Sequence, residues 1–216
     1  MLINETYFQG DIMIPNITEV HSDNDFVRGL IESESRLLLE SVLGFELFNE
    51  FVSNLDGNGN LKPDAGQKWK NLVYGNIYEV GNINHQFKGL IQETPLYKTS
   101  LIADYVYYRW MKSTSSQSTG TGEAVLNGKN SSNVNGSQKL VTIWNRFFKL
   151  LTNGSHQKPY RGYVNGVCFV DWYGSNQRNS VSVFQFLTDN KEDYPNPGLQ
   201  LPLSEDYFGY KNQLGL

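Results

Sequence analysis

The chain has 216 residues, enough for a domain with a sizeable hydrophobic core. Its 18 Lys and Arg residues against 22 Asp and Glu residues leave a formal charge of −4, which excludes a protein that grips nucleic acid through a broad basic surface. The single cysteine, Cys168, cannot form an internal disulfide, and it lies in an apolar run typical of a small buried side chain. No signal peptide or membrane span is expected, because no apolar run is long enough.

The first part of the chain predicts an extended lead-in over residues 1–22, followed by a helical region. That region starts at Asp23 or Asp25, either of which can cap a helix. Apolar residues then recur at helical spacing as far as Leu55, with one interruption at Leu43-Gly44. We therefore expect two helices, or one kinked helix, that share an apolar side.

The segment 56–60 (DGNGN) resembles the opening of a calcium-binding EF-hand loop. The remainder of that motif is missing, because Leu61 stands where glycine is needed and Gln67 where a bidentate glutamate is needed. We expect a turn here, then a short helix that starts at Pro63 and Asp64 and runs through Val73. Weak alternation over residues 76–92, around Gly81-Asn82, predicts a β-hairpin.

Two further helices are predicted by strong periodicity. The first covers residues 96–112 and has two apolar faces, which indicates burial on more than one side. The second begins at Ser137 and ends at Asn153-Gly154.

The loop between these two helices, residues 113–136, consists mainly of Ser, Thr, Gly and Asn. Such a long polar loop is either a solvated linker or a segment that becomes ordered against a partner. The apolar residues Val125 and Leu126 within it favour the second interpretation, since a solvating linker has no need of them.

After residue 154 the helical periodicity disappears, and short β-type runs alternate with polar turns. We predict a helical bundle core over residues 1–154 and a C-terminal extension over residues 155–216 that attaches to other proteins. The fold class is expected to be mainly α, with a β-hairpin, a long loop and an extended arm with short strands. Aromatic residues in the arm are candidate partner contacts because they give large contact area at low entropic cost.

No constellation for catalysis is present. The three histidines, His21, His85 and His156, have no second ligand at helical spacing, and Gly122 to Lys129 departs from the phosphate-binding loop pattern. Asp171 lies beside two aromatic residues, which fits the rim of a sugar site, but no partner carboxylate is recognisable. We expect no catalytic residue, no metal site and no cofactor. The candidate interface residues are Phe87, Leu90, Val125, Leu126, Trp172, Tyr173, Tyr207, Phe208 and Tyr210.

Three segments carry a resemblance to a known family: residues 37–51 (LLLESVLGFELFNEF), the hairpin with Tyr78, Gly81 and 87–90 (FKGL), and the aromatic helix 103–110 (ADYVYYRW). Together they resemble the head-tail connector or adaptor proteins of tailed phages infecting Bacteroidetes, including the crAss-like phages. The similarity covers roughly residues 25–152 and says little about the residues after 154.

The resemblance implies a structural virion protein that forms a ring, of about twelve copies, between the portal and the tail. The partners would be further copies of the chain, the portal, other neck or tail proteins, and double-stranded DNA that passes through the channel without sequence-specific binding. Assembly would take place in the host cytoplasm, without a membrane. The alternative is a carbohydrate- or receptor-binding virion module that uses Trp172, Tyr173 and the terminal aromatics.

Overall fold

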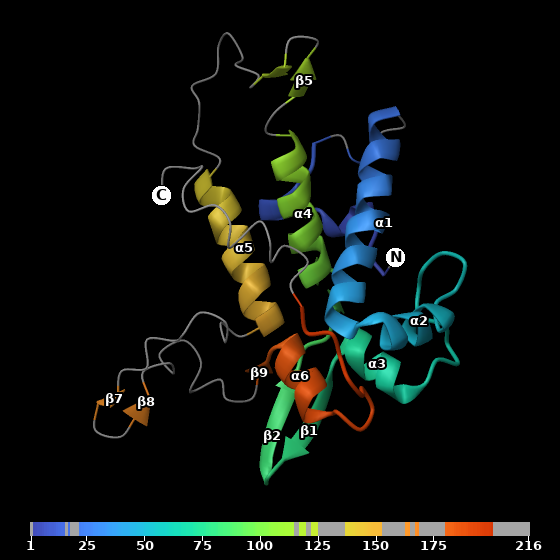
Figure 1. Ribbon diagram of the computed structural model, residues 1–216, viewed down its shortest axis with the longest axis vertical. Coiled ribbons are helices and arrows are strands. Elements are labelled where there is room, and N and C mark those ends of the chain that lie inside the picture. Colours follow the sequence, from blue (N-terminus) through green and yellow to red (C-terminus); the bar gives the residue numbers. More distant parts are fainter. Residues whose placement is uncertain are drawn as a thin grey trace.

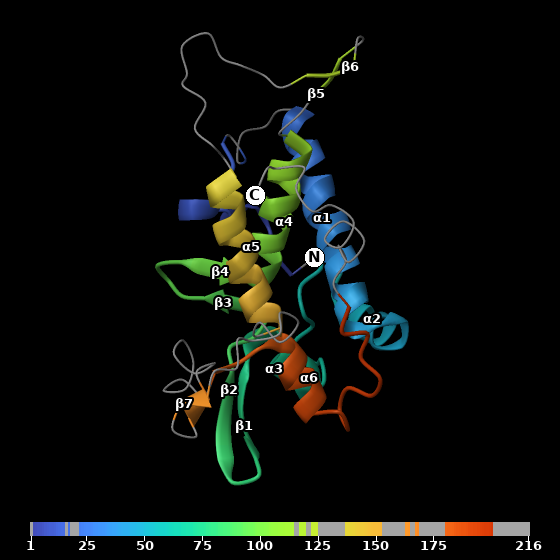
Figure 2. The ribbon, with the colours of Figure 1, turned by 60° about the vertical axis from the view of Figure 1, so that its left-hand side comes forward.

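The protein is described by a computed structural model that covers residues 2–15, 17, 22–114, 117–119, 122–124, 137–152, 163–164, 167–168 and 180–200. Helices α1 (Ser22–Leu43), α4 (Leu101–Thr114) and α5 (Ser137–Thr152) lie side by side, and two β-hairpins project from them (Figure 1 and Figure 2). The predicted mainly α fold with a β-hairpin is confirmed.

Helix α4 is the centre of the core. Every residue from 101 to 107 is buried, which confirms that this helix is covered on more than one side. Its start, however, lies five residues later than the sequence predicts. Ser100 caps the helix by accepting a hydrogen bond from the Ile102 N–H (3.0 Å) and donates to the Leu90 carbonyl (2.8 Å). Residues 96–100 therefore belong to a hairpin.

The helical region before α4 breaks where the sequence predicts it. Helix α1 ends at Leu43, and α2 (Phe45–Ser53) follows Gly44, whose φ of 78° is the left-handed conformation that glycine adopts readily. Helix α3 (Gln67–Tyr74) begins a few residues after the predicted start at Pro63. The turn at Asp56 is confirmed, because its carboxylate accepts backbone N–H groups from Asn58 (2.8 Å) and Asn60 (2.9 Å).

The strands form small sheets at the ends and sides of the helical core. Strands β1 (Asn76–Val80) and β2 (Ile83–Phe87) form the predicted hairpin, closed by Gly81 and Asn82 at φ of 55° and 69°. Strand β9 (Ser180–Val181) pairs parallel with β2 at the other edge. A second hairpin joins β3 (Ile91–Glu93) to β4 (Lys98–Ser100).

Several shorter elements complete the described chain. Two 3₁₀ turns, η1 (Glu5–Tyr7) and η2 (Gly10–Ile12), carry buried apolar residues where the sequence indicates only an extended lead-in. Within the long polar loop, β5 (Gln117–Thr119) pairs with β6 (Gly122–Ala124). Strands β7 (Tyr163–Val164) and β8 (Val167–Cys168) pair in the same antiparallel way.

The predicted division at residue 154 does not hold for residues 180–200, which are part of the core. Helix α6 (Val183–Asp189) buries four residues, and its Phe186 ring stacks on Phe87 of β2 with centroids 4.2 Å apart. Tyr194 is also buried and donates a hydrogen bond to the Lys68 carbonyl. The sequence pattern misses this because a helix of only seven residues is too short to show a period.

After Tyr194 the chain crosses the break between α1 and α2, and we call residues 196–200 the strap. The backbone N–H groups of Leu199 and Gln200 donate to the carbonyls of Val42 (3.0 Å) and Ser41 (3.1 Å), which lie in the last turn of α1. A Cβ atom on Gly198 would lie 2.5 Å from the Ser41 carbonyl oxygen, so this close approach requires glycine. The strap thus caps the C-terminal end of α1, although the two segments are far apart in the sequence.

We predict that Phe186→Ala lowers the free energy of unfolding by about 3 to 4 kcal/mol, because it removes a buried ring between Phe87 and Tyr194. The matched control is Gln185→Ala, which changes an exposed residue of the same helix. Urea denaturation followed by circular dichroism measures both. Equal stability of the two variants would show that α6 is not part of the folding unit.

Candidate interaction surface

The hairpin of β3 and β4, residues 91–100, projects from the side of the helical core, and we call it the finger (Figure 2). Its turn is closed between Thr94 and Tyr97. The Thr94 N–H donates to the Tyr97 carbonyl (2.9 Å), and the Tyr97 N–H donates to the Thr94 hydroxyl oxygen (3.1 Å). Pro95 stands at the second position of this turn, where its fixed φ is already suitable. The tip of the finger is therefore locally rigid.

The tip presents two large apolar side chains to solvent. Leu96 is 92% exposed and Tyr97 is 51% exposed, the first being the most exposed large hydrophobic residue in the described part of the chain. Exposed apolar residues are common when scattered, but here two neighbours lie on a turn that is held in one conformation. A preorganised apolar tip loses little entropy on binding, which favours its use as a contact.

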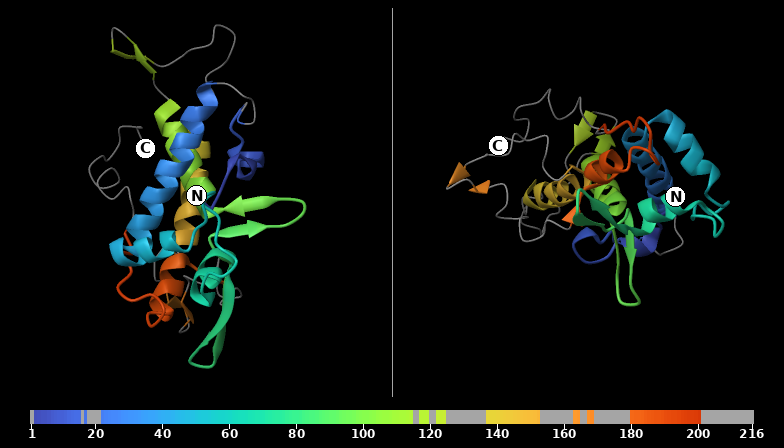
Figure 3. Two further views of the ribbon diagram at one scale, coloured as in Figure 1. Left: turned by 90° about the vertical axis from the view of Figure 1, so that its right-hand side faces the viewer. Right: turned by 90° about the horizontal axis from the view of Figure 1, so that it is seen from below.

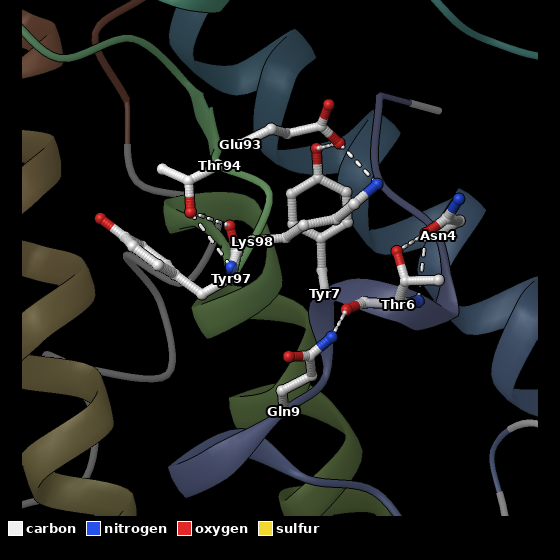
Figure 4. A network of polar contacts seen from close by, with 8 residues as sticks. All are labelled: Asn4, Thr6, Tyr7, Gln9, Glu93, Thr94, Tyr97 and Lys98. Carbon is white, nitrogen blue, oxygen red and sulfur yellow. Dashed lines mark hydrogen bonds and ion pairs between the residues drawn. The ribbon is translucent and has the colours of Figure 1, made fainter.

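A polar network ties the base of the finger to the N-terminal segment (Figure 4). The Tyr7 hydroxyl donates to Glu93 Oε1 (2.8 Å), and Lys98 Nζ lies 2.8 Å from the same oxygen. The Lys98 ammonium also lies 5.4 Å from the centre of the Tyr7 ring. Asn4 caps η1 by accepting the Thr6 N–H (3.0 Å), which fixes the turn that carries Tyr7.

These contacts shift the pKa values of Glu93 and Tyr7. The hydrogen bond from Lys98, followed by that from Tyr7, holds the pKa of Glu93 below its usual value. Burial, together with the bond to Glu93, raises the pKa of Tyr7. At neutral pH the finger is therefore anchored by a charged carboxylate between a cation and a phenol.

A cleft of about 360 Å³ lies beside the base of the finger. Inside it, Arg146 of α5 donates from Nε to Asp104 Oδ2 (2.8 Å) and from a second nitrogen to Oδ1, while Asp11 lies 3.7 Å from Arg146. Burial raises the pKa of Asp104, and the guanidinium opposes that rise. Both carboxylates face the Arg146 guanidinium, and the pair of Asp104 and Arg146 joins α4 to α5.

The other hairpin also exposes apolar residues. Ile77 and Val80 of β1 are 67% and 40% exposed, and β1 is an edge strand whose outer side has no partner strand in the described residues. Figure 3 shows the two hairpins pointing in different directions, the first along the long axis and the finger to one side. The protein thus presents apolar residues on two separate projections.

Two of the residues predicted to contact a partner lie in the described part of the chain, and both are buried. Phe87 and Leu90 are only 3% and 2% exposed, so their side chains fill the protein's own core and cannot form a partner surface. Strand β2 buries Phe87 beneath α6, which the sequence pattern does not reveal. The remaining candidates lie outside the described residues: Val125, Leu126, Trp172, Tyr173, Tyr207, Phe208 and Tyr210.

Sequence reasoning misses Leu96 and Tyr97 as a surface. Tyr97 and Leu101 share a helical period, so the predicted helix, residues 96–112, includes both Leu96 and Tyr97. The useful signal is Pro95: the residue before a proline avoids helical backbone, so Thr94 to Tyr97 has the composition of a turn.

Two general findings concern the described residues alone. No group of three His, Cys, Asp or Glu side chains there lies close enough together to hold a metal ion. None of the helices in that part of the chain is both long and apolar enough to cross a membrane.

Comparison with known proteins gives no relative from which a function could be transferred. No family model matches the chain, and neither a curated protein nor a solved structure is significantly similar to it.

We predict that Glu93→Gln destabilises the protein at pH 7 by up to about 1 kcal/mol. The effect is small because solvent exposure of the carboxylate weakens its ion pair with Lys98. Because folding lowers the pKa of Glu93, its carboxylate stabilises the fold at pH values above its usual pKa of 4.5. This contribution is lost as the pH falls through the lowered pKa. The difference between variant and wild type should therefore shrink between pH 6 and pH 3. Thermal unfolding across that range measures it.

The control for this experiment is Glu79→Gln, which neutralises an exposed carboxylate on β1. It should change stability by less than half as much. A Glu93→Gln effect that is constant with pH would contradict the anchoring role of the charge.

Proposed function

We propose that the chain is a structural virion protein, an adaptor whose copies form a ring between the portal and the tail of a phage particle. The observation that carries this proposal is the finger, a rigid hairpin that holds Leu96 and Tyr97 in solvent away from a helical core. Contacts made by projecting, preorganised apolar residues are typical of subunits that assemble. The resemblance of residues 25–152 to phage adaptors supports the same function.

The arrangement of the projections favours a ring over a two-fold dimer. A head-to-tail contact joins two different surfaces of each copy, and it closes into a ring when the rotation between copies closes. The finger and the β1–β2 hairpin lie on different sides, so one chain can contact more than one neighbour (Figure 3).

The charge of the chain fits a DNA channel in which the duplex must move freely. A formal charge of −4 gives no broad cationic surface to hold phosphates, so DNA would pass without being retained. The partners in this proposal are further copies, the portal and neighbouring neck proteins.

The test is the mass and shape of the full chain, purified alone and after co-expression with the portal protein of the same phage. We expect rings in negative-stain images, with a mass that is an integer multiple of the 24.6 kDa chain, at least when the portal is present. A chain that remains a monomer under both conditions, and that is absent from the neck in a reconstruction of the particle, would contradict the proposal.

A further inference from the structure

A second exposed apolar feature lies at the break between α1 and α2. There Leu37 and Phe45, 42% and 71% exposed, flank a shallow hollow. We call this the hollow, and it is lined by Leu37, Glu40, Ser41, Gly44, Phe45, Gly198 and Gln200. Its floor is formed where the strap crosses α1, and that floor has no side chain because Gly44 and Gly198 approach each other directly.

The finger and the hollow lie on opposite sides of the molecule. In Figure 2 the finger points to one side while α2 and the strap lie on the other, and both views of Figure 3 show the same relation. The finger of one chain therefore cannot reach the hollow of the same chain.

We propose that the finger of one copy docks into the hollow of the next copy, so that Leu96 and Tyr97 pack against Leu37 and Phe45. This inference rests on the proposed function, because it names the contact that builds the ring. A projecting tip and a recess on opposite sides of one chain form a heterologous contact, in which each copy gives its finger to one neighbour and its hollow to the other.

The chemistry of the two surfaces is complementary. Each carries an aromatic ring and a leucine, Tyr97 and Leu96 at the tip of the finger and Phe45 and Leu37 on either side of the hollow. At the edges, Glu40 and Glu46 are exposed and pair with no cation among the described residues, whereas Lys88 is exposed beside the base of the finger. Apolar contacts with opposite charges around them are the usual arrangement of a specific interface.

A two-fold contact satisfies these surfaces less well. Two hollows placed face to face would bring Glu40 and Glu46 of one copy against the same carboxylates of the other, and two concave surfaces would leave a void. The opposite placement of finger and hollow also suits a ring of many copies. For twelve copies, the two contact faces of each subunit are separated by about 150°, close to directly opposite.

The test uses paired cysteines in the full chain carrying Cys168→Ser, which removes the native thiol. Leu96→Cys and Leu37→Cys are introduced separately and together, and the protein is co-expressed with the portal and then oxidised. The double variant is expected to give a ladder of cross-linked multimers, and each single variant to remain a monomer on denaturing gels. Disulfide-linked dimers of either single variant, or the absence of a ladder from the double variant, would overturn the inference.

A second measurement does not depend on cross-linking. Leu96→Asp should weaken self-association roughly tenfold or more while leaving the melting temperature unchanged, because residue 96 is 92% exposed. The matched control is Phe26→Asp, which places the same charge at an exposed apolar position of α1 outside both hairpins (56% exposed) and should leave association unchanged. Equal loss of association in both variants would overturn the assignment to the finger.

The two proposals fail in distinguishable ways. Rings in which the double-cysteine variant gives no ladder would overturn the contact and leave the adaptor function standing. A ladder formed by a chain that never joins a portal would support the contact and contradict the adaptor function.

Discussion

The burial of the first two turns of α4 on all sides is the constraint on which the rest of the structure depends. A helical segment with no solvent face needs neighbours in every direction, and its polar atoms need partners within the core. Arg146 of α5 pairs with Asp104 on one side, and Glu34 of α1 accepts the Tyr105 hydroxyl at 3.2 Å on the other. Arg109 lies 3.2 Å from the same Glu34 carboxylate. These contacts set the positions of α1 and α5 around α4.

The finger takes its position from the same helix. Strand β4 runs directly into α4, with Ser100 joining the two, so the hairpin cannot swing without disturbing the central helix. Tyr7 holds the other strand through Glu93. The exposed tip is therefore carried by the most buried part of the protein, and this is how a short hairpin can present Leu96 at a fixed point in space.

The sequence predicts the elements whose pattern is long and local. Helix α5 has bounds very near the predicted ones, and the break at Gly44 and the turn at Gly81-Asn82 are signalled by residues within the turns themselves. The features that it does not predict depend on distant residues. Phe87 is buried because α6 covers it, and α6 is too short for periodicity to show. The proposed contact is equally hidden: Leu96 fits a helical period, and the hollow exists only because Gly198 crosses α1 far along the chain.

The parallel pairing of β9 with β2, and the strap after it, have a consequence for biosynthesis. Strand β2 leaves the ribosome well before residues 180–200 have been synthesised, so Phe87 and Trp69 initially lack the aromatic cover that Phe186 and Tyr194 provide. Contacts between such distant segments also form slowly. The hollow at the α1–α2 break is complete only after the strap, with Gly198, has packed against α1. A nascent chain therefore lacks one half of the proposed contact, and self-association through it is delayed until residues 196–200 have been synthesised and have packed against α1.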